Sequence, residues 1–245
     1  MSAGERLPGT PDPMHRWPGA KGLIIAGDAW GDPAGQLVML LHGGGQTRHA
    51  WKGTGEALAQ AGFRAYALDA RGHGDSDWAE DGDYEQDRMI ADLVSVVAKI
   101  GDPNPILVGA SMGGGVSLCA VGEQAVAARA LIMVDTAPQI EKEGTQKIRN
   151  FMAQKPDGFD SLDEVAEAIA NYQPHRKRRR NFDGLKKNVR LDLKGRLRWH
   201  WWSRRPRDRS ARGRETAFRP PAGRSAAVGR VSSRRYAGCA SYRLE

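Results

Sequence analysis

A serine in a glycine-rich turn is the strongest candidate for chemistry in this sequence. Residues 109–113 read Gly-Ala-Ser-Met-Gly and lie between the apolar residues 104–108 and a helical pattern that begins at Met112. In a turn from strand to helix, small neighbours let the chain bend sharply and expose the Ser111 hydroxyl. The N–H groups at the start of the helix favour a developing negative charge. Such a pattern also occurs in structural Gly-Ser turns, but its position between strand and helix favours Ser111 as a nucleophile.

A second glycine-rich loop could supply hydrogen-bond donors to a substrate. His42 and the three glycines at residues 43–45 directly follow the apolar residues 36–41. Glycines let the backbone approach a substrate closely, with N–H groups free to point at it. We expect an oxyanion hole formed by the N–H groups of Gly44 and Met112, the residue after the candidate nucleophile. The alternative is a phosphate-binding loop, but the Gly-Lys-Ser/Thr ending of such loops is missing.

The elements that must position these residues alternate between strands and helices. Apolar runs of strand length are separated by segments whose apolar residues recur at helical spacing. This alternation favours an α/β fold with a parallel sheet and helices on both faces, in which ligands bind at the carboxyl ends of the strands. The sequence predicts strands within residues 22–26, 36–44, 63–72, 104–111 and 128–135, and helices within residues 50–62, 83–101 and 112–122.

Four segments resemble successive landmarks of the α/β-hydrolase fold family. They read HGGGQTRHAW from His42, ALDARGHGDSDW from Ala67, ILVGASMGG from Ile106 and LIMVDTAP from Leu131. Their order and spacing are similar to those of the family over about residues 20–137. The resemblance implies a mostly parallel sheet with a helical lid, and a serine nucleophile that needs neither a metal nor a cofactor.

The resemblance also implies a reaction class. The expected activity is hydrolysis of a small-molecule ester, thioester or activated ketone through Ser111. The branch of the family that this sequence resembles also includes cofactor-free, non-haem peroxidases, which would use the same serine. Epoxide hydrolases and haloalkane dehalogenases of the family carry Asp at this turn, so Ser111 counts against both. Asp135, at the end of a predicted strand, is a candidate catalytic acid, although a structural role is the commoner one for such a residue.

Other polar residues of these motifs are expected to be structural. In the family the turn at residues 69–76 is braced by its Asp and Arg. His73 precedes the nucleophile, whereas the family order is Ser, Asp, His. We expect His42 to anchor its loop and His49 to lie at the surface.

Residues 139–202 resemble the lid that this family inserts after the sixth strand. Helices are predicted within residues 141–154 and 161–172. Ser161 and Glu164 have the spacing of a capping box, in which each side chain bonds to a backbone N–H at the start of the helix.

The rest of the lid is basic and rich in tryptophan. Trp199, Trp201 and Trp202 would either line an apolar pocket beside Ser111 or pack the lid. The run of Lys and Arg at residues 176–180 is interpreted as a solvated lid face. The alternative of another class is a nucleic-acid-binding protein that uses this basic C-terminal part.

The family pattern stops near Trp202. Residues 203–245 contain 12 Arg but no Lys, Ile or Met, and such a segment cannot bury enough apolar surface to become ordered. We therefore expect the sheet to lack its last two strands, and we hypothesise a frameshift near Trp202. A functional Arg-rich tail and an unusual intact fold are the alternatives. After Ser111 the only histidines are His175 and His200, both in the lid, so no catalytic His is assigned and an impaired enzyme is expected.

Charge and composition bound the organisation of the chain. Residues 1–172 hold 14 Lys and Arg against 24 Asp and Glu, whereas residues 173–245 hold 23 against 5. No apolar run approaches the ~18 residues of a membrane span, and only two cysteines are present, which fits a reducing cytoplasm. We expect a cytoplasmic protein with a small-molecule substrate and no specific nucleic-acid or membrane partner. The predicted parts are a disordered segment (residues 1–19), the core (20–138), the lid (139–202) and a disordered Arg-rich tail (203–245).

Overall fold

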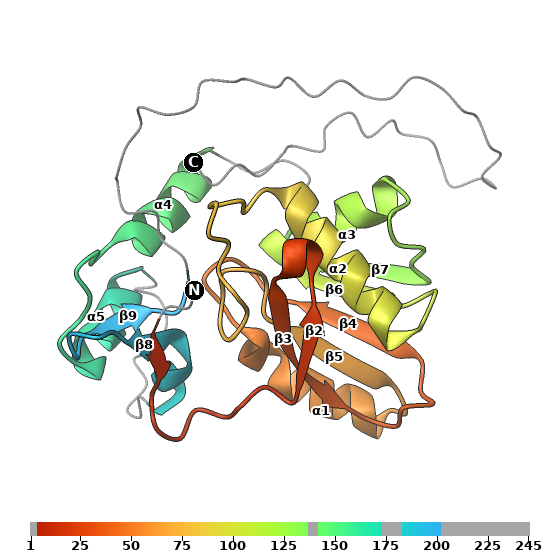
Figure 1. Cartoon of the computed structure of the whole chain (residues 1–245), viewed down its shortest axis with the longest axis horizontal. Coiled ribbons are helices and arrows are strands. Elements are labelled where there is room, and N and C mark those ends of the chain that lie inside the picture. Colours follow the sequence, from red (N-terminus) through yellow and green to blue (C-terminus); the bar gives the residue numbers. More distant parts are fainter. Residues whose placement is uncertain (1–3, 137–141, 173–182, 202–245) are drawn as a thin grey trace.

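The computed structural model describes residues 4–136, 142–172 and 183–201, which form a helix-covered sheet with a smaller lid beside it (Figure 1). The main sheet has six strands in the order β2-β3-β5-β4-β6-β7. Strands β5, β4, β6 and β7 are parallel, whereas β2 and β3 pair antiparallel. The prediction of a mostly parallel sheet is therefore confirmed. The strands are β2 (His15–Pro18), β3 (Ile24–Trp30), β4 (Leu37–Leu41), β5 (Arg64–Leu68), β6 (Ile106–Ala110) and β7 (Ala130–Val134).

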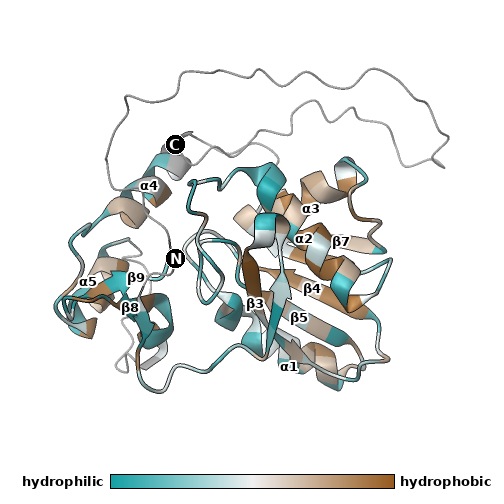
Figure 2. Ribbon diagram, in the orientation of Figure 1, coloured by the Kyte–Doolittle hydropathy of each residue, from teal (hydrophilic) through white to brown (hydrophobic). Residues whose placement is uncertain are grey.

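Helices cover both faces of this sheet, α1 on one face and α2 and α3 on the other (Figure 1). Apolar residues are concentrated in the strands and in α3 (Figure 2). The larger core cluster includes Met39, Leu93 and Val116 and lies between the sheet and α2 and α3, while a smaller one around Leu40 faces α1. The elements are α1 (Lys52–Gln60), α2 (Gln86–Ile100), α3 (Met112–Gly122) and the 3-10 turns η1 (Ala20–Gly22) and η2 (Arg48–Trp51).

The lid has its own small core. An apolar cluster that includes Phe159, Val165 and Trp199 lies between its helices and a three-stranded sheet of order β1-β8-β9. The lid elements are α4 (Lys142–Ala153), α5 (Leu162–Tyr172), η3 (Asp183–Asn188), β8 (Val189–Leu191) and β9 (Leu197–Trp199), and β1 (Glu5–Arg6) joins them from the N-terminus.

The capping box predicted at the start of α5 is half present. The Glu164 N–H donates to the Ser161 hydroxyl oxygen at 3.3 Å. The Glu164 carboxylate reaches back to the N–H of Asp160 at 3.0 Å, rather than to that of Ser161. Backbone N–H groups at the start of α5 therefore bond to the two expected side chains, but one of the donors is Asp160 instead of Ser161.

The N-terminal segment differs from the disorder expected for residues 1–19. Within it, β2 pairs with β3 in the main sheet, and β1 pairs with β8 of the lid. Trp17 packs against the larger core cluster. These contacts are made with residues far along the chain, so a local composition rich in Pro and Gly does not reveal them.

Strand β7 leaves an apolar edge uncovered. Among the described residues it is the outermost strand at its end of the sheet. Ile132, Met133 and Val134 are 50%, 38% and 42% exposed, although large apolar side chains are normally buried in a parallel sheet. In the part of the chain that the structure describes, the main sheet thus ends at β7.

Candidate active site

Ser111 lies in a strained turn between β6 and α3. Its backbone has φ 45° and ψ −111°, a conformation that non-glycine residues rarely adopt. The flanking glycines permit the turn: a Cβ on Gly109 would lie 2.4 Å from the Gly113 carbonyl oxygen, and one on Gly113 would lie 2.5 Å from that of Leu41. The Ser111 N–H donates to the Val134 carbonyl of β7 at 3.1 Å. Ser111 is therefore held, partly exposed, at the carboxyl end of the sheet and at the start of α3.

The glycine-rich loop after β4 packs against this turn. A Cβ on Gly43 would lie 3.4 Å from the Ser111 Cβ. The Gly113 N–H donates to the His42 carbonyl oxygen at 3.2 Å, which ties the loop to the first turn of α3. The two glycine-rich segments are therefore neighbours in space, as their predicted shared role requires.

Two N–H groups at this junction have no acceptor among the described residues. The Gly43 N–H donates to a glutamine side chain at 3.0 Å, and the Gly45 N–H donates to a histidine ring at 3.2 Å. Within residues 4–136, 142–172 and 183–201, the N–H groups of Gly44 and Met112 donate to no acceptor. These are the two donors that the sequence predicted for an oxyanion hole.

The lid contacts the same loop. A Cβ on Gly44 would lie 3.9 Å from the Met152 sulfur of α4, and one on Gly45 would lie 3.4 Å from the Trp201 ring. The indole N–H of Trp201 donates to the Met152 carbonyl at 3.2 Å. Trp199 stacks on Trp201, with ring centroids 4.5 Å apart. Both tryptophans pack the lid, and Trp201 also touches the loop beside the two unpaired N–H groups.

Three buried histidines form a row beneath this loop. The ring centroids of His42 and His73 are 5.2 Å apart, and those of His73 and His200 are 5.8 Å apart. Each ring accepts a backbone N–H: His42 from Ala70 at 3.0 Å, His73 from Gly45 at 3.2 Å and His200 from Gly74 at 2.8 Å.

Burial keeps these rings neutral. It lowers the pKa of His42 to about 4 and that of His73 to about 3, and it lowers the pKa of His200 well below its ordinary value. His42 anchors its loop, as predicted. No histidine in the described part of the chain hydrogen-bonds to Ser111, so none of these rings is placed as its general base.

Buried ion pairs join the lid to the core under the loop. Arg48 donates to Asp69 at 2.6 Å and to Asp75 at 2.8 Å. The other oxygen of Asp75 accepts a hydrogen bond at 2.9 Å from Arg190, which belongs to β8 of the lid. The turn at residues 69–76 is thus structural, as predicted. His49 is a correction: its side chain is only 9% exposed, because η2 packs against the sheet instead of lying at the surface.

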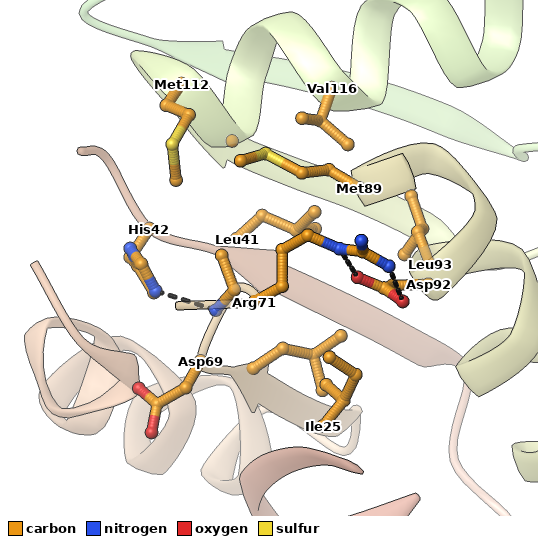
Figure 3. Close-up of a pocket in the computed structure, with 13 residues that line it drawn as sticks. Ile25, Leu41, His42, Asp69, Arg71, Met89, Asp92, Leu93, Met112 and Val116 are labelled. Carbon is orange, nitrogen blue, oxygen red and sulfur yellow. Dashed lines mark hydrogen bonds and ion pairs between the residues drawn. The ribbon is translucent and has the colours of Figure 1, made fainter. Parts of the chain in front are cut away.

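A cavity of about 40 Å³ lies beside the turn that carries Ser111 (Figure 3). Met112 and Val116 point into it from α3, and Arg71 crosses it to donate two hydrogen bonds to Asp92, at 2.6 and 2.8 Å. A cavity of this size holds a few waters at most, so it is not a substrate site. Arg71 instead fixes α2 to the turn after β5.

The remaining predicted residues divide into two groups. Asp135 directly follows β7, with φ 50° and an exposed side chain, and no described residue pairs with its carboxylate. His175, the basic run 176–180, Trp202 and the tail 203–245 lie outside the described residues.

Among the residues that are described, no group of three or more His, Cys, Asp or Glu side chains is arranged to hold a metal ion. None of the described helices combines the length and apolarity that a bilayer crossing requires.

Solved structures share this fold. An α/β hydrolase from Novosphingobium aromaticivorans superposes with a TM-score of 0.68 at 23% identity, over 79% of this chain and 70% of that one. The thioesterase domain from the curacin biosynthetic pathway gives a TM-score of 0.60 at 23% identity, over 78% and 73% of the two chains. At this identity the likeness concerns the fold alone.

Curated relatives are similar over part of their length. Protein phosphatase methylesterase 1 of Bos taurus is 33% identical over 138 residues, 54% of this chain and 36% of that protein. Esterase Rv0045c of Mycobacterium tuberculosis is 30% identical over 158 residues, 60% of this chain and 50% of that protein. Epoxide hydrolase A of the same species is 30% identical over 179 residues, 71% of this chain and 56% of that protein. The chain thus spans about a third to a little over half of the length of these relatives.

A family model extends the match over most of the chain. The model of the alpha/beta hydrolase fold matches residues 36–231, which include the glycine-rich loop, the strained serine and the lid. The match continues past Trp202, near which the family pattern was expected to stop. Together with the parallel sheet and its order of elements, this match shows that the chain belongs to the α/β-hydrolase fold family.

Proposed function

We propose that this chain is built as a serine hydrolase for a small ester, thioester or activated ketone. The observation that carries the proposal is the junction at Ser111, where a strained, partly exposed serine adjoins the unpaired N–H groups of Gly44 and Met112. The N–H groups of a glycine-rich loop and of a helix N-terminus can be left free for a ligand, and free donors are useful where negative charge develops. Relatives named as an esterase and as methylesterases support an ester as substrate.

The geometry suggests a reaction in two steps. The Ser111 hydroxyl oxygen attacks the acyl carbon of the substrate while its proton passes to a base. The former carbonyl oxygen becomes negative and accepts hydrogen bonds from Gly44 and Met112. The bond to the leaving group then breaks as that group takes up a proton, and water hydrolyses the acyl-serine by the same route.

The base is what the described site lacks. His42, His73 and His200 each accept a backbone N–H, and burial keeps them neutral. We therefore propose that solvent accepts the Ser111 proton in this chain and that turnover is slow. Serine proteases stripped of triad members keep ~10³–10⁴-fold catalysis over water from binding and the oxyanion hole alone. Asp135 stays a candidate acid, with no described histidine to orient.

Covalent labelling tests the nucleophile. A fluorophosphonate should label the chain slowly at one serine, and Ser111→Ala should abolish the label. Ser95→Ala is the matched control, because Ser95 lies on α2 with its hydroxyl bonded to the Pro18 carbonyl and should leave labelling unchanged. Equal labelling of the wild type and Ser111→Ala would refute Ser111 as the nucleophile.

A chemical rescue tests the missing base. Imidazole added in solution should accelerate the hydrolysis of an activated ester by the wild type more than by Ser111→Ala. The Ser111→Ala protein serves as the control, because it measures the hydrolysis that imidazole catalyses without the serine. Equal stimulation of both proteins would mean that Ser111 is not limited by the lack of a base. A parallel assay for peroxide-dependent bromination separates ester hydrolysis from the peroxidase alternative.

The composition of the tail carries a separate proposal. We propose that residues 203–245, with 12 Arg and no Lys, Ile or Met, arise from a frameshift near Trp202. The gene around codon 202 should then contain an insertion or deletion whose reversal restores strands, an Asp and a His in frame. A gene in which no such single change restores them would contradict the frameshift and favour a functional Arg-rich tail.

A further inference from the structure

The two peptide groups that flank Gly44 are each held by a histidine ring. The first group contains the Gly43 carbonyl and the Gly44 N–H. That carbonyl lies 2.8 Å from Nδ1 of His42, and because the other ring nitrogen accepts a backbone N–H, Nδ1 of the neutral ring carries the hydrogen and donates it. A peptide group is planar and trans, so fixing this carbonyl also fixes the direction of the Gly44 N–H. The second group contains the Gly45 N–H, which donates to Nε2 of His73 at 3.2 Å.

This support matters because a glycine restrains its backbone less than any other residue. Gly44 has no Cβ, so the peptide groups on either side of it can rotate at little steric cost. An oxyanion, however, needs its donors at roughly 2.7–3.1 Å from the charged oxygen. A displacement of about 1 Å can lower the rate of an enzyme ~100-fold. The rings that hold the peptide groups beside Gly44 therefore decide whether its N–H can serve an oxyanion hole.

The ring of His73 is itself held in the orientation that this role requires. Its Nδ1 lies 3.2 Å from the Arg71 carbonyl oxygen, and since Nε2 is the accepting nitrogen, Nδ1 carries the hydrogen and donates it to that carbonyl. Burial lowers the pKa of His73 to about 3, so Nε2 keeps its lone pair at neutral pH. His73 thus offers the glycine-rich loop a neutral acceptor in a fixed position.

The lid supports the same ring. Nδ1 of His200 accepts the Gly74 N–H at 2.8 Å, next to His73 in sequence, and the ring centroids of the two histidines are 5.8 Å apart. The backbone N–H of His200 donates to a carbonyl of the lid at 3.1 Å, which fixes the residue within the lid. The ring of Trp201 lies 3.4 Å from a Cβ built on Gly45. Two consecutive lid residues thus contact the turn that carries His73 and the glycine that donates to it.

We propose that His73 is a positioning residue for the oxyanion hole and that His200 supports it from the lid. The inference rests on the proposed function, because it concerns how the Gly44 N–H is presented to the oxyanion. Without the acceptor on His73, the Gly45 N–H loses its partner and the peptide groups around Gly44 are free to turn. The Met112 N–H belongs to the first turn of α3 and keeps its place, so part of the hole survives.

The rate at which a fluorophosphonate labels Ser111 in the full chain tests the role of His73, because the oxygen on phosphorus gains negative charge as the serine bonds to it. His73→Leu removes the acceptor but keeps a side chain in the buried space. It should lower the maximal labelling rate about tenfold and leave the probe concentration at half-maximal rate unchanged. His73→Gln brings an amide oxygen near the position of Nε2 and should restore the rate to within about threefold of the wild type. A residue that only stabilises the fold predicts neither this rescue nor a loss confined to the maximal rate.

The lid residue is tested in the same assay. His200→Leu should lower the maximal rate about threefold, and His200→Asn, whose amide oxygen takes the place of Nδ1, should restore it. Because His200 acts through His73, the double variant His73→Leu/His200→Leu should label no more slowly than His73→Leu alone.

Ser76→Ala is the matched control for lost stability. It removes the side-chain acceptor of the buried Ala26 N–H, which belongs to β3 and not to the glycine-rich loop. This variant should destabilise the chain but leave the labelling rate unchanged. A variant that is partly unfolded labels to a lower final extent, whereas a displaced Gly44 N–H lowers the rate. If His73→Leu does not fold, the comparison of His200→Leu with His200→Asn carries the same test.

The outcomes that contradict the proposal are distinct from those that contradict the nucleophile. His73→Leu that labels as fast as the wild type, or His73→Gln that labels as slowly as His73→Leu, would overturn the role of His73. An equal loss of rate in Ser76→Ala would overturn it too, because stability alone would then explain the effect. In each of these cases labelling still depends on Ser111 and the proposed function stands. Labelling that persists in Ser111→Ala would refute the proposed function and this inference with it.

Discussion

At the scale of single residues, the turn at Ser111 depends on the absence of a Cβ atom at its glycines. A Cβ on Gly109 would lie 2.4 to 2.5 Å from three backbone atoms of Gly113 and Gly114, and backbone of this kind cannot move aside. We expect Gly109→Ala to lower the free energy of unfolding by roughly 3 kcal/mol, as overpacking does. Gly53→Ala is the matched control: Gly53 lies in α1 with nothing within 4 Å of its Cβ position, and alanine there should add roughly 0.5 kcal/mol. Urea unfolding measures both, and an equal effect of the two would contradict the steric account.

The buried histidines predict how stability depends on pH. In the unfolded chain they take up protons near pH 6.5, whereas in the folded chain His42 stays neutral down to about 4 and His73 to about 3. Stability is therefore full above pH 6.5 and is lost as the pH falls toward those values. Each of these two histidines lowers the free energy of unfolding by about 2 kcal/mol between pH 6.5 and 5, because one pH unit corresponds to 1.36 kcal/mol.

Denaturation at several pH values checks this dependence. The Asn side chain of His73→Asn has an oxygen that can accept the Gly45 N–H, but it does not titrate. This variant should therefore reduce the pH dependence of the free energy of unfolding by the contribution of one histidine. A His73→Asn curve as steep as that of the wild type would mean that His73 takes up its proton at the same pH in the folded and the unfolded chain.

At the scale of elements, Asp75 links the lid to the core. This carboxylate accepts from Arg48 of the core and from Arg190 of the lid strand β8, and all three side chains are almost fully buried. Asp75→Asn leaves two buried guanidiniums with less opposite charge, whereas Arg190→Met leaves Asp75 paired with Arg48. We expect Asp75→Asn to cost roughly 3 kcal/mol or more and Arg190→Met clearly less, because an unpaired buried charge costs more than a lost pair. Urea unfolding of the two variants measures the difference, and the reverse order would contradict the account.

Elements within the core could be predicted from local pattern, and elements that join distant segments could not. The stripe of Met89, Leu93 and Val96 predicts α2, and the left-handed Gly101 ends it, because both signals lie within the helix itself. Strand β1 has only two residues and owes its existence to β8, more than 180 positions away along the sequence. The row of buried histidines likewise joins the loops after β4 and β5 to the lid, and no sequence spacing reveals such a contact.

At the scale of the whole molecule, charge divides the chain into two unlike parts. Residues 1–172 carry 24 acidic against 14 basic side chains, and residues 173–245 carry 5 against 23. In the described core, three of the acidic residues, Asp69, Asp75 and Asp92, each pair with a buried arginine. The basic residues are concentrated in a segment with few acidic neighbours in sequence. We therefore expect the excess positive charge of that segment to attract external anions.

This asymmetry predicts that the chain binds nucleic acid by charge alone. Contacts between Lys or Arg and phosphates release counterions, so log affinity falls linearly with log salt, with a slope of about 0.9 per contact on duplex DNA. We expect weak binding to unrelated duplexes of equal length at low salt, with equal affinities, and loss of binding near physiological salt. Replacing the five basic residues of the run 176–180 by Gln should lower the slope by up to about 4.5 if all five contact phosphates. Fluorescence anisotropy over a salt series measures both quantities. Binding that survives physiological salt and prefers one sequence would instead make nucleic-acid recognition the function of the basic segment, since simple charge attraction discriminates neither sequence nor site.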